Sequence, residues 1–385
     1  HYLRYAVLDG AALNYMVGHA DFHGRLGDTT LVYWAEGAEP AYGSAFMAMM
    51  GMGGDDKNEI TQKELSGLLT ALCQGNTVKW ENVPLNPKNR FYILGLVPNA
   101  SRLSVRFFLQ NSFDEFAQNY QKHQDDLKIV HSASDERETL SMWALLGETV
   151  VKKNNKPPKS QRQLVEEIEE TAIKNPNKPP KFQRQLVEEM LNAILTGSPY
   201  PSTLFTQVEI RIRAEKDINR GKAAIIKAYL RRNVVEQQRK NAHVYEEVLG
   251  VALNVSKTTD LPYRLGRLFA VLEALQLEAF KDNNNRDSKP NTTIKDQFFS
   301  SACATPAVAF PIIVGRAQNH LRKLKAKNKE GLARYYSDMM DDIIGNFEEK
   351  RYPAHLSLED QGIFQIGYYH QRQRMYAKKE EKDNG

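Results

Sequence analysis

The sequence has few cysteines and no long apolar segment. Cys73 and Cys303 are the only two cysteines among 385 residues, which is too few for a disulfide framework, and they do not have metal-ligand spacing. No run of about eighteen apolar residues occurs, so no segment is predicted to span a membrane. We therefore expect two buried, unreactive thiols in a protein of the reducing cytoplasm.

Catalytic signatures are also missing. No Gly-x-Ser-x-Gly elbow or kinase signature occurs, and the glycine-rich residues 49–58 lack the Gly-Lys-Ser/Thr ending of a nucleotide-binding loop. His19 and His23 lie four residues apart near Asp28, like a metal pair, but Gly24 and Gly27 would break a helix there. We expect no catalytic residues, no metal and no cofactor. A metal-dependent hydrolase using His19, His23 and Asp28 remains the alternative.

The chain is ordinary in bulk composition. It is 41% hydrophobic and 26% charged, as in a globular protein, and is long enough for two or three domains. It begins at His1 and not at a methionine, so we expect that an N-terminal part of the natural protein is missing.

Positive charge is concentrated in two segments. The formal net charge is only +5, yet residues 209–240 hold ten basic residues against four acidic ones. Residues 316–334 hold seven basic residues against one acidic residue. Basic stripes on a nearly neutral chain are typical of a surface that binds a polyanion. Solvated helix faces are the alternative.

The periodicity of the sequence predicts an α+β chain that becomes helical. Residues 1–135 mix helical patterns with strand patterns, including a strand at residues 29–35, and form the first predicted domain. Residues 136–260 form a helical region, and residues 261–385 form a C-terminal helical bundle. The helical region contains a duplication of 22 residues, because a segment beginning at Lys156 recurs at Lys178 with one mismatch in twelve. With no third copy, this is a local extension and not a solenoid.

Residues 91–108 form two apolar runs around a Pro-Asn corner. On the second run, a strand, Leu103, Val105 and Phe107 would face a core, whereas Arg102 and Arg106 would face the other way. Same-face residues of a strand lie about 6.6–6.8 Å apart, near the spacing of successive phosphates on a single nucleic-acid strand. These arginines are predicted to contact a nucleic-acid backbone. Ion pairs across the sheet are the alternative.

The C-terminal segment, residues 355–376, interleaves aromatic side chains with basic and amide groups. If it is helical, Tyr369, Gln373 and Tyr376 line one stripe, and His370 and Arg374 line the next. Such a surface can stack unpaired bases. Packing between helices is the alternative.

Six segments together resemble one family, the large subunit of the type I-C CRISPR Cascade complex (Csd-type). They occur in family order over about residues 28–376 and comprise residues 27–36, 91–108, 194–232, 263–276, 291–311 and 355–373. The resemblance implies a non-enzymatic subunit of a bacterial antiviral, RNA-guided complex. It implies that residues Leu261–Gly385 resemble the Cascade small subunit. The missing N-terminal portion would carry much of the motif-reading surface, so no base reader can be named.

The resemblance also implies the partners: crRNA, double-stranded target DNA and its displaced strand, the Cascade backbone and small subunits, and the helicase-nuclease. The subunit would hold crRNA and target, stabilise the R-loop, assist recognition of the protospacer-adjacent motif and recruit the nuclease. The predicted nucleic-acid-binding residues are Asn99, Arg102, Arg106, Arg211, Arg213, Lys227, Arg231, Arg232, Arg316, Arg322, Lys323, Lys325, Lys327, His370, Arg372 and Arg374. A helical scaffold that binds only protein is a further alternative.

Overall fold

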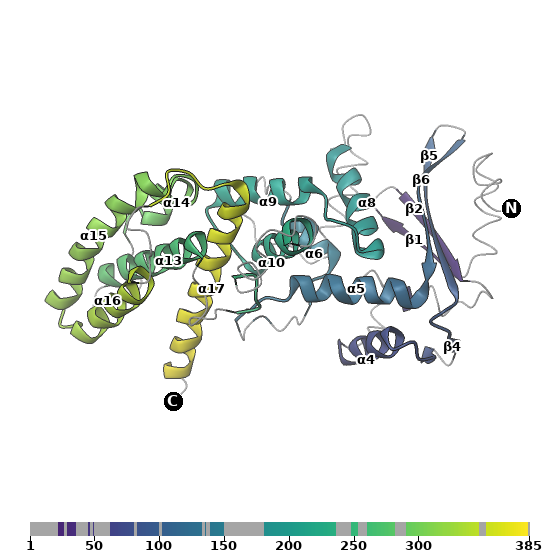
Figure 1. The fold of residues 1–385 in the computed structure, drawn as a ribbon, viewed down its shortest axis with the longest axis horizontal. Helices are drawn as coiled ribbons and strands as arrows, with labels where there is room; N and C mark the ends of the chain where they lie inside the picture. Colours follow the sequence, from purple (N-terminus) through teal and green to yellow (C-terminus); the bar gives the residue numbers. More distant parts are fainter. Residues whose placement is uncertain are drawn as a thin grey trace. The chain divides into compact units, whose positions relative to one another are not determined.

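A computed structural model describes much of the chain, in two compact units. Unit 1 comprises His1–Asp125 and Glu138–Leu204, and unit 2 comprises Asp126–Arg137 and Phe205–Gly385. The predicted α+β class is confirmed (Figure 1). The predicted boundaries at residues 135 and 260 stay a prediction. The described residues are 22–26, 29–35, 45–46, 49, 62–80, 83–99, 102–132, 135, 139–149, 181–235, 248–252, 260–281, 290–345 and 352–383.

Unit 1 is built on a four-stranded antiparallel sheet in the order β1-β2-β5-β6. Its strands are β1 (Phe22–Leu26), β2 (Thr29–Ala35), β5 (Arg90–Asn99) and β6 (Arg102–Ser112). The strands predicted at residues 29–35 and within 91–108 are confirmed. A separate hairpin joins β3 (Val78–Trp80) to β4 (Val83–Leu85).

A β-bulge interrupts the pairing of β5 with β6. Gly95 pairs with Phe107, but Leu96 pairs with Val105, so Arg106 is the extra residue. A Cβ atom on Gly95 would lie 2.6 Å from the Phe107 ring, so any other residue there would require the ring to move. The predicted alternation is therefore wrong at Val105, which is 37% exposed, because the bulge resets the faces of β6. The side chains of Arg102 and Leu103 lie outside the described residues.

Aromatic side chains pack one helix of unit 1, α5 (Phe113–Leu127), on the sheet. The ring of Phe91 on β5 lies edge-on to the rings of Phe113 and Phe116 on α5, whose centroids are 5.2 and 5.7 Å from its own. The amide of Asn119 on α5 donates to the last-turn carbonyl of Leu195 at 2.8 Å. The helices are α4 (Gln62–Cys73), α5 (Phe113–Leu127), α6 (Met142–Gly147) and α8 (Lys181–Thr196).

The helix α8 contains most of the second copy of the duplication and follows its two prolines. It ends at Thr196 and is followed by Gly197, whose φ of 70° is the left-handed conformation that commonly terminates a helix. The first copy lies outside the described residues.

Unit 2 is helical, and helical segments predicted from periodicity are confirmed in it. Its helices are α9 (Ser202–Glu215, beginning in unit 1), α10 (Arg220–Tyr229), the π-helical turn η1 (Leu230–Val235), α13 (Leu261–Phe280), α14 (Ile294–Ala304), α15 (Pro306–Ala326), α16 (Glu330–Ile344) and α17 (Leu358–Asp383). The buried helix α13 lies among α14, α15, α16 and α17 (Figure 1).

Two glycines bring α13 and α17 into backbone contact. A Cβ atom on Gly266 would lie 1.9 Å from the carbonyl oxygen of Phe364, and one on Gly367 would lie 2.1 Å from that of Tyr263. Any side chain at either position would force the helices apart. This close approach fixes which residues of the two helices face each other.

Candidate nucleic-acid interface

Two of the cations predicted to bind nucleic acid are instead buried around Asp126. The side chain of Arg232 is fully buried, and its Nε and Nη2 donate to Asp126 Oδ2 at 3.2 and 3.0 Å. Lys227 is also fully buried, and its Nζ donates to the carbonyl oxygens of Asp126 and Lys128 at 3.0 and 2.6 Å. Buried charges require such partners, so these two cations support the fold of unit 2 and are not offered to phosphate.

Arg211 is also buried and bonded to a carboxylate within the protein. It is 2% exposed, and its Nε and Nη2 donate to Glu215 Oε1 at 3.0 and 2.7 Å. Lys222 donates to the other oxygen of the same carboxylate. Partial burial raises the pKa of Glu215, but the hydrogen bonds and charges of Lys222 and Arg211 outweigh it and lower that pKa. The three groups form an internal ion cluster, and Arg211 leaves the candidate interface.

His370 is a neutral packing residue. It is 1% exposed, and its Nδ1 lies 2.8 Å from the hydroxyl of Tyr263 on α13. Burial, together with the positive charge of Lys227, lowers its pKa to about 3. The neighbouring Tyr369 hydroxyl donates to the carbonyl of Val130 at 2.8 Å. The structure therefore supports helix packing for these two residues rather than base stacking.

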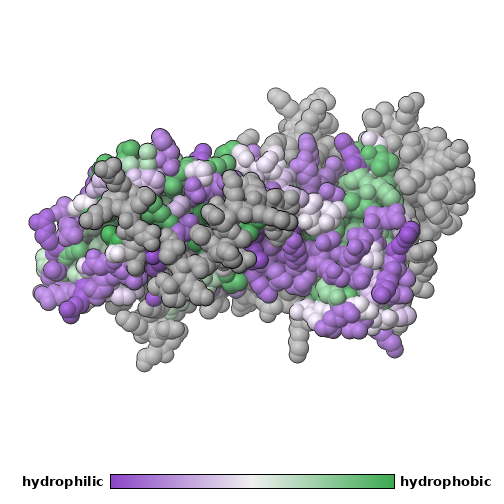
Figure 2. Space-filling model, viewed as in Figure 1, coloured by the Kyte–Doolittle hydropathy of each residue, from purple (hydrophilic) through white to green (hydrophobic). Residues whose placement is uncertain are grey.

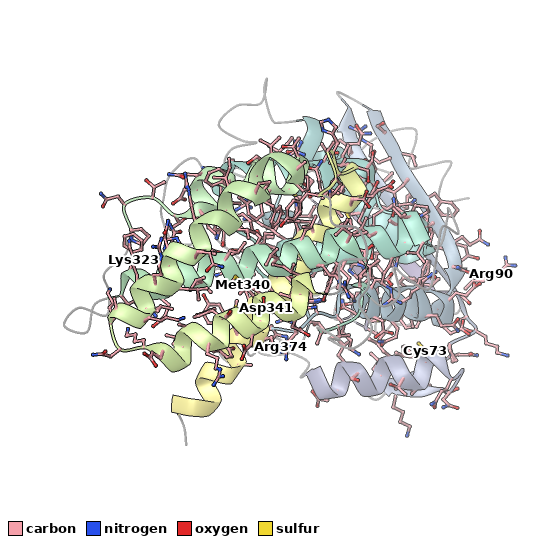
Figure 3. All side chains as sticks on the ribbon, turned by 60° about the vertical axis from the view of Figure 1, so that its left-hand side comes forward. Cys73, Arg90, Lys323, Met340, Asp341 and Arg374 are labelled. Atoms are coloured by element: carbon pink, nitrogen blue, oxygen red, sulfur yellow. The ribbon has the colours of Figure 1, made fainter. Side chains whose placement is uncertain are left out.

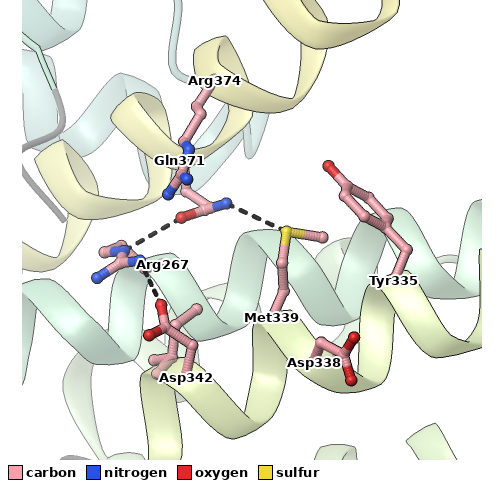
Figure 4. Close-up of a pocket in the computed structure, with 8 residues that line it drawn as sticks. Arg267, Tyr335, Asp338, Met339, Asp342, Gln371 and Arg374 are labelled. Atoms are coloured by element: carbon pink, nitrogen blue, oxygen red, sulfur yellow. Dashed lines mark hydrogen bonds and ion pairs between the residues drawn. The ribbon is translucent and has the colours of Figure 1, made fainter.

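Arg372 and Arg374 have different environments on the same helix. The guanidinium of Arg372 lies over the rings of Tyr368 and Tyr376, with centroids 5.4 and 5.7 Å away. It also lies 3.6 Å from Asp217. Arg374 makes no hydrogen bond or ion pair with the rest of the described chain, and it faces a pocket (Figure 4). That pocket contains residues that the sequence analysis did not single out, because three separate helices contribute them.

Three of the predicted residues, Arg106 on β6, Arg213 on α9 and Arg231 on η1, have exposed side chains. Asn99 and Arg102 pair at the tip of the β5–β6 hairpin, although their side chains are not described. Arg106 is 47% exposed, with Nε 3.9 Å from Glu188. Arg213 is 52% exposed and donates to Gln361 at 3.1 Å. Exposed ion pairs and hydrogen bonds of this kind contribute about 0–1 kcal/mol, so a phosphate could replace them.

Arg231 completes that group. It is 44% exposed, and its Nε lies 3.6 Å from Asp126, the carboxylate that Arg232 already holds. Its guanidinium therefore remains available to solvent while Arg232 supplies the buried half of the pair.

The C-terminal half of α15 carries four exposed cations, which we call the α15 basic patch: Arg316, Arg322, Lys323 and Lys325. The opposite face of the helix packs inward through Ile313, Ala317, Leu321 and Leu324. Within the part of the chain that the structure describes, no carboxylate pairs with any of the four cations. Hydrophilic residues cover this end of the bundle, and Lys323 extends from the helix (Figures 2 and 3).

The basic residues predicted within residues 316–334 are not equivalent in the structure. Lys327 leaves the patch, because its Nζ donates to the carbonyl oxygens of Ala279 and Lys281 at 3.1 and 2.9 Å. It thereby satisfies carbonyl groups at the end of α13. Lys323 lies 4.4 Å from the centroid of the Phe280 ring, whereas Arg316 covers Phe298 at 5.0 Å. Arg322 bonds only its helical neighbour Asn319, so it and Lys325 have the greatest freedom to reach a ligand.

The other groups considered in the sequence are the two cysteine thiols and the possible metal ligands. Cys303 is buried as predicted, Cys73 is half-buried, and burial raises the pKa of both thiols. The side chains of His19, His23 and Asp28 lie outside the described residues. Among those described, no group of three or more His, Cys, Asp or Glu side chains could hold a metal ion. No helix in that same part of the chain has both the length and the apolar character needed to cross a membrane.

Comparison with known proteins agrees with the family that the sequence motifs indicated. The model of one protein family, described as CRISPR-associated protein (Cas_Csd1), matches residues 6–376. A search of curated proteins found no match. Since the family match spans nearly the whole sequence, the chain belongs to the Csd1 family of CRISPR-associated proteins.

Proposed function

We propose that this protein is the non-catalytic, nucleic-acid-binding large subunit of a type I-C Cascade complex. In this role it holds crRNA and target DNA, stabilises the R-loop, assists recognition of the protospacer-adjacent motif and recruits the helicase-nuclease. Its further partners are the Cascade backbone and small subunits. The observation that carries the proposal is the α15 basic patch, whose cations have no carboxylate partner among the described residues. The membership of the chain in a CRISPR-associated family gives this patch a nucleic-acid context.

The chemistry of the patch suits a nucleic-acid backbone. Lysine and arginine side chains that neutralise phosphates release condensed counterions, which makes binding favourable and dependent on salt. Such contacts carry little sequence information. This limitation is acceptable in an RNA-guided complex, because base pairing between guide and target reads the sequence. The protein then needs to supply charge and shape, which the exposed cations of α15 provide.

The test compares a variant that lacks three positive charges of α15 with a control variant that lacks three positive charges elsewhere. The test variant changes Arg316, Arg322 and Lys325 to Gln, and Lys323 is left in place because it lies nearer to its aromatic ring, 4.4 Å from the Phe280 centroid, than Arg316, which lies 5.0 Å from that of Phe298. The control variant changes Lys79, Lys88 and Arg90 to Gln, which are exposed cations of unit 1. Binding of single-stranded DNA and of the target duplex by the assembled complex is measured across a salt series.

The expected result is weaker target binding by the test variant at about 150 mM salt, with guide-RNA assembly unchanged. If all three cations meet phosphates, the slope of log K against log salt flattens by about 2 for a single strand, at about 0.7 per phosphate. The loss should be similar for different target sequences. Equal slopes in the test variant, the control variant and the wild type would show that the patch is only a solvated helix face.

A further inference from the structure

A small pocket opens in unit 2 between α13, α16 and α17 (Figure 4). Its volume is about 200 Å³. Sites for drug-sized ligands usually occupy roughly 300–1,000 Å³, so this pocket has room for about one ring system. Cationic groups enter from α13 and α17, through Arg267 and Arg374, and anionic groups enter from α16, through Asp338 and Asp342.

The inner wall of the pocket is held by buried hydrogen bonds. Gln371 on α17 is 1% exposed, and its Oε1 accepts from Nε of Arg267 at 3.1 Å. Its amide also points at the sulfur of Met339, 3.8 Å away. Arg267 is 3% exposed, and its Nη2 lies 3.8 Å from Asp342, which is a long ion pair. Arg267 is therefore fixed in position, and its guanidinium lacks a close carboxylate partner among the described residues.

The two arginines influence each other across the pocket. Burial lowers the pKa of Arg267; Tyr263 and Asp342 raise it, whereas the positive charge of Arg374 lowers it further. An acceptor atom placed between the two guanidinium groups would relieve this repulsion. Neither Arg374 nor Asp338 forms a hydrogen bond or ion pair within the described chain, so both side chains are available at the mouth.

The mixed charge of the wall restricts the ligand. A simple anion would meet two carboxylates, and a simple cation would meet two guanidinium groups. A neutral ring with acceptors on one edge and donors on the other satisfies both signs. Guanine has this pattern: O6 and N7 suit an arginine fork, and N1–H with the N2 amino group suits a carboxylate. Tyr335 also lines the pocket, and an aromatic ring can stack on a base.

We propose that this pocket binds an unpaired guanine base of a single nucleic-acid strand, with arginine contacts to its O6/N7 edge and aspartate contacts to its N1/N2 edge. The inference rests on the proposed function, because it assumes that single-stranded nucleic acid reaches unit 2. It goes further by giving this non-catalytic surface a base preference. A bidentate contact to the correct base corresponds to roughly 5- to 150-fold discrimination.

The test uses the full chain and short oligothymidylates whose central base is guanine, adenine or thymine. Binding is followed by fluorescence anisotropy at about 150 mM salt. The variant Asp338→Asn weakens the proposed contact to the N1/N2 edge of guanine. The variant Arg374→Gln removes the proposed contact to its O6/N7 edge. The controls Asp341→Asn and Arg334→Gln make the same charge changes at exposed positions of α16 that do not line the pocket. Circular dichroism checks that each variant is folded.

The expected result is about tenfold tighter binding of the guanine oligonucleotide by the wild type and by both control variants. Both pocket variants should lose this preference while still binding all three oligonucleotides. GMP should compete for the site, whereas AMP and inorganic phosphate at the same concentration should not.

Three outcomes would overturn the inference. Equal affinity for the three oligonucleotides would mean that no base is read, although the proposed nucleic-acid-binding function would stand. Competition by inorganic phosphate as strong as that by GMP would mean that the pocket holds only an anion. Absence of binding to any oligonucleotide would contradict the proposed function as well as the pocket.

Discussion

The hydroxyl group of Tyr263 on α13 lies 2.8 Å from Nδ1 of His370 on α17, in a buried seam of unit 2. The two rings meet edge-on, with centroids 5.9 Å apart. The seam keeps the imidazole neutral, because burial and the charge of Lys227 lower its pKa to about 3. A histidine so placed makes stability depend on pH.

The loss of folding stability at acidic pH should therefore depend on His370. An unfolded histidine has a pKa of about 6.5, so below that pH the unfolded chain binds a proton that the folded chain excludes until about pH 3. Stability should fall as pH decreases through this window, by up to about 1.4 kcal/mol per pH unit. In thermal melts between about pH 7.5 and pH 5, His370→Gln should flatten this slope. The exposed His355, changed to Gln, serves as the control. Identical slopes in all three proteins would contradict the assignment.

Glu209 should give a pH dependence of the opposite sign. Burial raises its pKa to about 7, outweighing the hydrogen bond from Gln365 and the nearby charge of Arg213. Because the unfolded pKa is about 4.3, the folded state holds a proton that the unfolded state releases, and stability is lost as pH rises through about 7. Glu209→Gln should therefore gain melting temperature relative to the wild type between about pH 5 and pH 8. Asp341→Asn, at an exposed position, should not. A constant offset at every pH would show that Glu209 ionises normally.

The backbone contact of α13 with α17 should not tolerate a methyl group. Gly266→Ala would place Cβ 1.9 Å from the Phe364 carbonyl oxygen, and we expect unfolding to become easier by more than about 3 kcal/mol. Gly315, in the exposed middle of α15, meets no atom within 4 Å, so Gly315→Ala should instead stabilise by about 0.5–1 kcal/mol. Chemical denaturation measures both. Equal effects would mean that the two helices separate at little cost.

Deletion of residues 156–177 should leave folding and complex assembly intact. The two copies of the duplication are nearly identical, so the deletion restores one junction ahead of α8 without removing the apolar face of that helix, which includes Leu186 and Met190. Size-exclusion chromatography and assembly with guide RNA check the result. Aggregation of the shortened chain would show that both copies are structural.

The purified chain should not cleave nucleic acid in the presence of Mn²⁺ or Zn²⁺. The sequence has no convincing metal or nucleophile cluster, and His19 and His23 lack the glutamate of a metalloprotease helix. Labelled DNA and RNA are incubated with the metal and analysed by denaturing electrophoresis. Cleavage that persists through further purification and disappears in His19→Ala would establish the hydrolase alternative.

Local patterns were sufficient to predict the secondary structure of much of the described chain. Thr29–Ala35, residues 91–108 and segments such as Leu261–Phe280 have two-residue or 3.6-residue periodicity, and each forms the predicted element. The family was also readable from the sequence, because its motifs are contiguous segments. The bulge beside Gly95 was not predicted, since it depends on the strand that pairs with β6.

Only the tertiary structure separated the exposed cations from the buried ones. Arg231 and Arg232 are neighbours in one basic stripe, yet Asp126, more than a hundred residues earlier, buries the second and leaves the first 44% exposed. Similarly, Lys325 faces solvent while Lys327 caps α13. Charge count and spacing are local properties of the sequence. Burial depends on distant partners, because a desolvated charge is stable only where folding supplies a carboxylate or carbonyl oxygen.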